Sequence, residues 1–132
     1  MTGETDLDSM LSLLQPRLLP GDFVFCTLPG GRYGDHQALV PLACFAEEEG
    51  LSLLLPRDAA DDAGLEYDGV FCCISLGVYS SLEAVGLTAA LAARLADHHI
   101  SANVIAAFHH DHILVPAGRA EEALAALQAL PG

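Results

Sequence analysis

The chain has 132 residues, of which 52% are apolar, 18 are acidic and 5 are basic, so its formal net charge is −13. Nucleic acids and anionic membranes are bound by clustered Lys and Arg, and the charge argues against both as partners. No apolar run reaches the roughly 18–20 residues that a membrane-spanning helix needs. The acidic first residues lack the basic segment of a secretory signal, which predicts a cytoplasmic protein.

Taken in chain order, the first half predicts short strands and small helices. Proline and glycine separate its apolar runs, and an Ala/Asp-rich segment is typical of a helix that Gly64 would end. The predicted elements are a helix at 9–14, strands at 23–28, 38–45 and 51–55, and a helix at 58–63. The glycines of the loop at 29–36 do not have the spacing of a phosphate-binding loop.

The second half predicts strand, helix, strand, turn, strand and helix. A strand at 69–79 leads into Ser80 and Glu83, which have the spacing of a capping box at the start of a helix. Leu87, Leu91 and Leu95 recur every four residues, which indicates one apolar face on that helix. Apolar segments at 101–108 and 113–115 predict two further strands around a polar turn, with an Ala/Glu-rich helix after Pro116.

Four cysteines, Cys26, Cys44, Cys72 and Cys73, lie in apolar runs without C-x-x-C spacing. We expect all four to be buried and reduced, because unpaired cysteine behaves as a small hydrophobic residue.

Residues 66–130 resemble the ACT domain, a βαββαβ module that senses small ligands. The resemblance is carried by Gly86 with the apolar helix behind it, and by the segment 96–105. It extends to small bacterial proteins with two ACT-like halves and to the ACT modules of cytosolic arginine sensors. ACT sequences usually place glycine where this chain has His99, at a left-handed helix cap, a conformation that histidine also tolerates.

A faint internal repeat of strand, turn, strand, proline, arginine and acidic helix predicts two ACT-like halves, 1–65 and 66–132. The resemblance implies an α+β, ferredoxin-like fold: an antiparallel sheet with helices on one face. The first helix of the N-terminal half would be reduced to the loop at 29–37. The C-terminal half lacks its last strand, so we expect an N-terminal strand to pair into its sheet, since an open apolar edge invites aggregation. A homodimer is also expected.

The resemblance implies a ligand site at the strand–helix junction, between modules. Free amides at a helix start suit a carboxylate, which predicts that the junction holds the α-carboxylate of an amino acid. Asp111 would accept its ammonium or a basic side chain, and His112 would line the same pocket. The predicted site residues are Ser80, Ser81, Leu82, Glu83, Val85, Gly86, Leu87, Asp111 and His112. Equally open is that Ser80 and Glu83 only cap a helix and that Asp111 belongs to a solvated turn.

Three functions therefore remain: an amino-acid-binding regulatory module without catalysis or cofactor, a structural dimerisation module without ligand, and a metal-dependent enzyme. The third would use the histidines of 98–99 and 109–112, although the strand between them separates the two clusters. No catalytic or DNA-binding domain is recognisable in the sequence, so a regulatory output would pass through a partner protein.

Overall fold

The computed structural model describes residues 15–77 and 87–128. The described residues form two compact units, which we describe separately. One, the inserted unit, is Gly21–Phe71; the other, the terminal unit, combines residues 15–20 with 72–128. The chain therefore completes the inserted unit between two segments of the terminal unit. The predicted division of the sequence into ACT-like halves at 1–65 and 66–132 stays a prediction.

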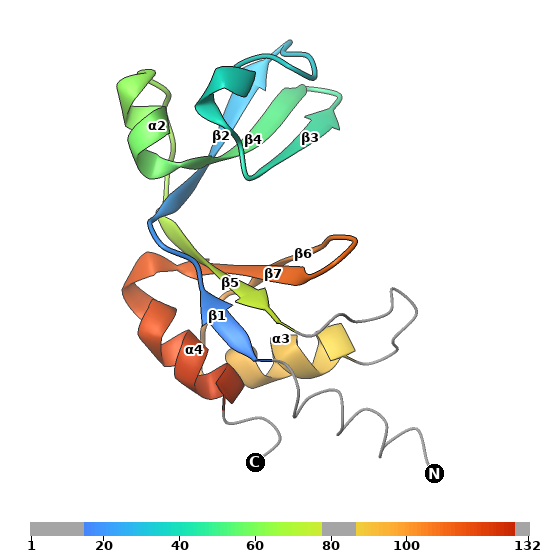
Figure 1. Cartoon of the computed structure of the whole chain (residues 1–132), viewed down its shortest axis with the longest axis vertical. Coiled ribbons are helices and arrows are strands. Elements are labelled where there is room, and N and C mark those ends of the chain that lie inside the picture. Colours follow the sequence, from blue (N-terminus) through green and yellow to red (C-terminus); the bar gives the residue numbers. More distant parts are fainter. Residues whose placement is uncertain (1–14, 78–86, 129–132) are drawn as a thin grey trace. The chain divides into compact units, whose positions relative to one another are not determined.

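The inserted unit consists of three antiparallel strands with one short helix (Figure 1). The order of the strands is β3-β4-β2, and Phe23 at the start of β2 also pairs with Phe71, the first residue of β5. The elements are β2 (Phe23–Pro29), the 3₁₀ turn η1 (Gln37–Leu39), β3 (Ala43–Glu47), β4 (Gly50–Pro56) and α2 (Arg57–Asp62). The predicted strand at 51–55 and helix at 58–63 are thus confirmed to within a residue at most ends.

Alternation along β2 and β4 builds the core of this unit. Val24 and Cys26 point to the same face as Leu51, Leu53 and Leu55, and all five are buried. Ala60 of α2 covers them. The β3–β4 hairpin depends on a glycine, because Gly50 has φ 149° and a Cβ on it would lie 2.2 Å from the carbonyl oxygen of Leu28.

Two expectations for the inserted unit are wrong. The segment 38–45 is not one strand: His36 and Val40 both adopt left-handed backbone, with φ of 58° and 53°, around the turn η1, so β3 begins only at Ala43. Cys44 is exposed on β3, whereas the other three cysteines are buried as predicted. Because β3 is an edge strand of this unit, its apolar sequence does not imply burial.

The terminal unit is a four-stranded sheet with two helices on one face (Figure 1). Its strand order is β1-β5-β7-β6, with β1 antiparallel to β5 and β6 antiparallel to β7. The elements are β1 (Pro16–Leu18), β5 (Phe71–Leu76), α3 (Leu87–Asp97), β6 (Asn103–Ala106), β7 (Asp111–Pro116), the 3₁₀ turn η2 (Ala117–Arg119) and α4 (Ala120–Gln128). The predicted ferredoxin-like α+β arrangement is confirmed. None of the helices in the described ranges is long and apolar enough to cross a membrane.

One face of β5 and β7 packs against α3 and α4 to form the core of the terminal unit. Leu91 and Leu95 are fully buried there, as their spacing predicts, while the side chain of Leu87 lies outside the described residues. The buried residues of this core are Cys72, Ile74, Leu76, Leu91, Leu95, Ile100, Ile113, Val115, Ala120, Ala123, Ala126 and Leu127.

The place of the missing last strand is taken by β1. Its residues pair with β5 from Pro16↔Leu76 to Leu18↔Ile74, so the sheet of the terminal unit is completed from the N-terminal side. An N-terminal strand was expected in this position, but the predicted strand at 23–28 belongs to the inserted unit instead. The predicted helix at 9–14 lies outside the described residues.

Candidate functional site

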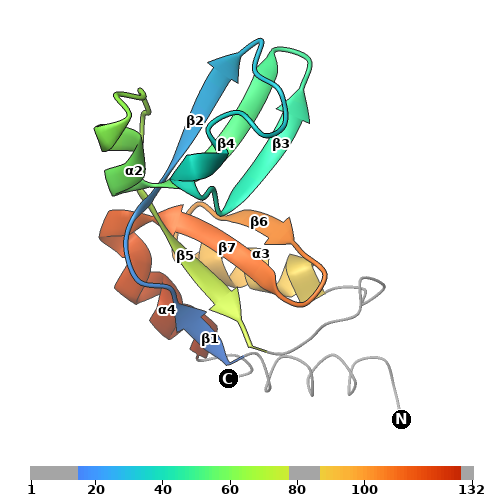
Figure 2. The same ribbon diagram turned by 45° about the horizontal axis from the view of Figure 1, so that its top comes forward.

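The described residues of the predicted site belong to elements that meet at one end of the sheet in the terminal unit. Figure 2 shows β5 and β7 side by side and running in opposite directions, so β7 begins where β5 ends. The first turn of α3 lies at the same end in both ribbon views. The predicted junction residues Ser80, Ser81, Leu82, Glu83, Val85 and Gly86 fall outside the described ranges. Of the predicted site, the structure therefore shows Leu87 as the first residue of α3, together with Asp111 and His112.

Asp111 is the first residue of β7 and pairs with Ala106 across the hairpin. Its exposed fraction is only 6%, so the interpretation as a solvated turn residue is wrong. Alternation along β7 places it on the face of Ile113 and Val115, which pack against the helices. A buried carboxylate requires compensating interactions, and Asp111 does have at least one partner.

His112 points to the opposite face of β7, because neighbouring strand residues alternate. It is half-buried, and its Nδ1 is buried without a hydrogen-bond partner in the described residues. Burial lowers the pKa of His112, the positive charge of His110 lowers it further, and Asp111 acts in the opposite direction. Asp111 and His112 are thus close in sequence but do not line one pocket from the same face.

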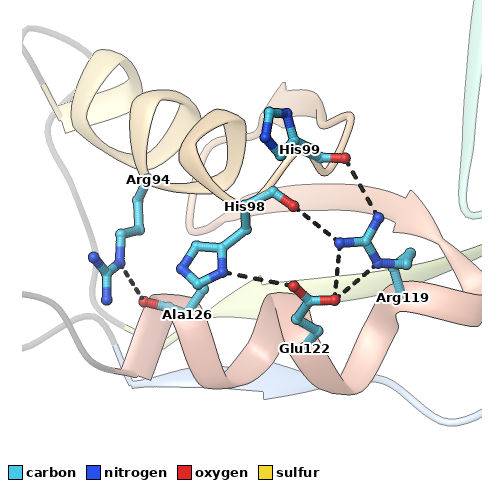
Figure 3. Close-up of polar contacts among 6 residues, drawn as sticks. All are labelled: Arg94, His98, His99, Arg119, Glu122 and Ala126. Atoms are coloured by element: carbon cyan, nitrogen blue, oxygen red, sulfur yellow. Dashed lines mark hydrogen bonds and ion pairs between the residues drawn. The ribbon is translucent and has the colours of Figure 1, made fainter.

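A network of polar groups joins the end of α3 to α4 (Figure 3). Nη2 of Arg119 donates to the carbonyl oxygen of His98 at 2.9 Å, and Nη1 donates to that of His99 at 3.4 Å. The same guanidinium binds Glu122 at 2.8 Å, and Nδ1 of His98 lies 3.6 Å from the other oxygen of Glu122. A cation at the C-terminus of a helix satisfies free carbonyls and interacts favourably with the negative end of the helix dipole, so this network stabilises the helix pair.

Metal and thiol chemistry find little support in the residues described. They contain no group of three or more histidine, cysteine or acidic side chains placed to hold one metal ion. Burial raises the pKa of Cys73 to about 11 and also raises that of Cys26, which keeps both thiols protonated. A protonated thiol is a poor nucleophile.

The inserted unit has two clefts that the sequence did not indicate. The larger, about 670 Å³, lies beside β2 and is lined by Phe25, Cys26, Thr27, Ser52, Leu65, Glu66, Tyr67 and Asp68; we call it the β2-edge cleft. The smaller, about 260 Å³, lies between the 33–37 loop and strands β3 and β4. The sequence does not predict the larger cleft, because residues 65–68 carry no motif and are brought to β2 by the fold alone.

Comparison with known proteins decides the family. One family model described as ACT domain matches residues 2–73, and a second model with the same description matches residues 70–129. The chain belongs to the ACT domain family. Both the resemblance noted in the sequence and the presence of two ACT-like halves are thereby confirmed. A search of curated proteins found no significant match.

Solved structures extend this assignment. A protein of unknown function from Vibrio cholerae, described as a possible transport protein, is 48% identical with a TM-score of 0.86, and the match covers 96% of each chain. A protein from Agrobacterium tumefaciens is 18% identical, with a TM-score of 0.71 over 86% of each chain. The regulatory subunit of aspartate kinase from Thermus thermophilus is 12% identical, with a TM-score of 0.62 over 92% of this chain and 99% of that one. At such low identity the last two show the fold alone.

Proposed function

We propose that this ACT protein is a non-catalytic regulatory module that binds a free amino acid at the end of the terminal-unit sheet where β5 ends. The α-carboxylate would meet the backbone amides of residues 82–87, and a cationic group of the ligand would meet Asp111. The observation that carries the proposal is the burial of Asp111 at the end of the sheet where α3 begins. A structural relative that is itself the regulatory subunit of aspartate kinase supports a regulatory role.

Burial strengthens the proposed contact with Asp111. A charge pair is worth more where water is partly excluded than at an exposed turn. The helix α3 is 11 residues long in its described part, so its start carries the partial positive charge that favours an anion. An anion-favouring helix start and an acidic strand start at one sheet end suit a ligand with both charges. His112 faces away from the helices, so a ligand held by Asp111 would not meet it on the same face of β7.

The test is thermal shift of the purified protein with each of the twenty amino acids at millimolar concentration. Ligand at a hundredfold above its dissociation constant stabilises the native state by about 2.7 kcal/mol, a rise of several degrees for a protein of this size. We expect a basic or polar amino acid to give this rise, and Asp111→Asn to remove most of it. Because Asp111 is buried, this variant is also expected to melt lower without ligand, so each shift is measured from the variant's own baseline.

Asp97→Asn is the matched control, because Asp97 is an exposed carboxylate in the same unit. It should keep the full ligand shift. If no amino acid moves the melting temperature, the sensor role is wrong. If a ligand binds Asp111→Asn as well as it binds the parent, the role of this carboxylate is wrong while the sensor role stands.

A structural dimerisation module is the second candidate, and the free edge of the inserted unit favours it. The edge strand β3 and the segment before it expose Val40, Leu42 and Phe45, with 75%, 40% and 71% of their surfaces accessible. An apolar edge strand is a template for pairing with a second chain. A homodimer joined along β3 is therefore part of the proposal, with a regulated partner protein in the cytoplasm receiving the output.

Phe45→Glu tests the dimer without touching either core. The parent is expected to sediment as a dimer at micromolar concentration and the variant as a monomer with an unchanged circular dichroism spectrum. Glu48→Gln, at an exposed position of the same hairpin, should stay dimeric. A parent that sediments as a monomer at every concentration would contradict this interface.

A further inference from the structure

We propose that the β2-edge cleft binds an extended, basic peptide segment of a partner protein, which adds as a strand beside β2. This site is distinct from the amino-acid site of the terminal unit and does not depend on it. It would give the protein a docking surface for its output. Three observations carry the proposal: main-chain groups on an open strand edge, a cleft along that edge, and the charge of its lining.

The register of β2 shows which main-chain groups face the cleft. The carbonyl oxygen of Asp22 accepts a hydrogen bond from the backbone N–H of Arg57, so the main chain at position 22 faces β4. In an antiparallel pair successive residues alternate between facing the partner and facing away. Positions 24, 26 and 28 therefore also face β4, while Phe25 and Thr27 direct their N–H and C=O groups away from it.

In the part of the chain that the structure describes, that outer side of β2 pairs with another strand only at its start. Phe23 pairs with Phe71, and a continued antiparallel ladder would set Phe25 opposite Gly69 and Thr27 opposite Tyr67. In the described residues the ladder stops after Phe23, because β5 begins only at Phe71. The segment 65–68 instead lines, together with residues 25–27 of β2, a cleft of about 670 Å³. An extended peptide has the alternating main-chain groups that this edge can pair with.

The wall of the cleft is tied to α2. The hydroxyl of Tyr67 donates to Asp61 at 2.7 Å and accepts from Nε of Arg57 at 3.2 Å. Arg57 also lies 3.7 Å from Asp22. Contacts within the unit thus fix the position of Tyr67 in the lining, and the basic side chain that contacts it, Arg57, is engaged with these neighbours.

The lining specifies the charge of the occupant. The carboxylates of Glu66 and Asp68 line the cleft and are exposed, and no arginine or lysine is among the lining residues. The rings of Phe25 and Tyr67 also line it, and aromatic faces attract guanidinium and ammonium groups. Complementary charge selects partners and speeds their encounter, so an extended segment with arginine or lysine at alternate positions fits this surface.

The probe is a fluorescein-labelled peptide with the sequence Val-Arg-Val-Lys-Val, blocked at its C-terminus, titrated with the full chain and followed by fluorescence anisotropy. Glu66→Gln combined with Asp68→Asn should weaken binding about fivefold or more. The control is Glu48→Gln combined with Glu49→Gln, which removes the same charge from an exposed turn of the same unit and should leave the affinity unchanged. Equal losses in the two double variants would mean general attraction to an acidic protein and would overturn the proposal.

Strand pairing is tested on the peptide, so that folding of the protein is not in question. Two further probes carry N-methyl groups on odd or on even residues, which removes alternate main-chain donors. Only one set of donors faces β2 in an added strand, so one probe should lose binding and the other should retain it. If both bind like the parent probe, no strand is added. If free arginine amide competes as strongly as the peptide on a molar basis, the cleft takes a small cation and the peptide proposal fails.

Discussion

The two units have the same strand order but distribute their helices differently. Counted from the hairpin, the inserted unit reads β3-β4-β2 with Phe71 of β5 at its end, and the terminal unit reads β6-β7-β5-β1. Between β2 and β3 the inserted unit has only the three-residue turn η1, whereas between β5 and β6 the terminal unit has the helix α3, which is 11 residues long in its described part. Family membership of both halves thus coexists with a reduced helix layer in one of them.

The difference in helices determines how each sheet is covered. In the described residues, the terminal unit buries 12 residues in its core and the inserted unit buries 6. The inserted unit, with less helix to cover it, leaves a cleft beside β2 and an apolar β3 edge accessible. A reduced helix layer would therefore free surface for the proposed partners, while the terminal unit has the helix start that the proposed amino-acid site requires.

Removing a core side chain from the first helix of each unit should give the largest effect. Leu91→Ala deletes a fully buried side chain of α3 and is expected to destabilise the protein by about 2–5 kcal/mol. Leu39→Ala in η1 removes a partly buried side chain, so about 1 kcal/mol is expected. Urea unfolding followed by circular dichroism measures both. Equal losses would show that η1 supports its core as strongly as α3 does.

Much of this layout is readable in the sequence, and the exceptions have physical causes. The spacing of Leu91 and Leu95 predicts the buried helix face, and Gly64 predicts the end of α2, because these signals are local. The strand β1 is only three residues long and begins with a proline, so nothing local distinguishes it; only its pairing with β5 makes it a strand.

The candidate site was less predictable than the fold. Aspartate is a common turn residue, yet β7 begins at Asp111, two residues before the predicted strand at 113–115, and carries this side chain to the buried face. The same limit explains Cys44, whose apolar neighbours suggest burial although an edge strand exposes it. Burial at the ends and edges of strands is set by tertiary structure, so the periodicity of apolar residues in the sequence does not predict it.

The second comparison is between the contributions to stability of Arg119 in the terminal unit and Arg57 in the inserted unit, each of which comes shortly after a proline in the sequence. Arg119 donates to two carbonyl groups at the end of α3 and binds Glu122, so Arg119→Ala should destabilise by about 1–2 kcal/mol. Arg119→Lys keeps the charge but not the planar fork and should recover only part of this. Arg57→Ala in the inserted unit should cost less, because Arg57 contacts exposed side chains rather than a helix end. The order of the three losses in urea melts checks this, and a larger loss at Arg57 would contradict it.

Left-handed caps provide a smaller contrast. Both α2 and α3 end with the same pair of hydrogen bonds, made by Gly64 and Leu65 in one and by His99 and Ile100 in the other. Gly64 has φ 70° and His99 has φ 58°. His99→Gly should therefore stabilise by about 0.5–1 kcal/mol, since glycine adopts this conformation without strain. Gly64→Ala should destabilise by about 1 kcal/mol, since alanine is strained in this conformation. No steric clash adds to this strain, because no atom lies within 4 Å of the added Cβ.

Thermal melts of the two variants and the parent decide whether backbone strain is the cause. The signs must be opposite, since one change removes a side chain from a left-handed position and the other adds one. A destabilising His99→Gly would mean that contacts of the imidazole outweigh the strain of its backbone.

The smallest expected effect is a pH dependence in the terminal unit. Burial, followed by the charge of His110, lowers the pKa of His112 in the folded state below its value in the unfolded chain. The unfolded chain then binds the proton more readily. The contribution of His112 to stability is therefore complete above about pH 6.5, the ordinary pKa of histidine, and is lost as the pH falls through the lower folded value.

Replacing His112 with Gln removes this titration, so the variant should lose less stability than the parent between neutral and mildly acidic pH. The His110→Gln variant keeps the half-buried imidazole of His112 and should retain most of the parent's dependence, reduced only by the loss of the neighbouring charge. Denaturant midpoints at a series of pH values measure both slopes, and identical slopes for the parent and His112→Gln would show that protonation of His112 is not coupled to folding.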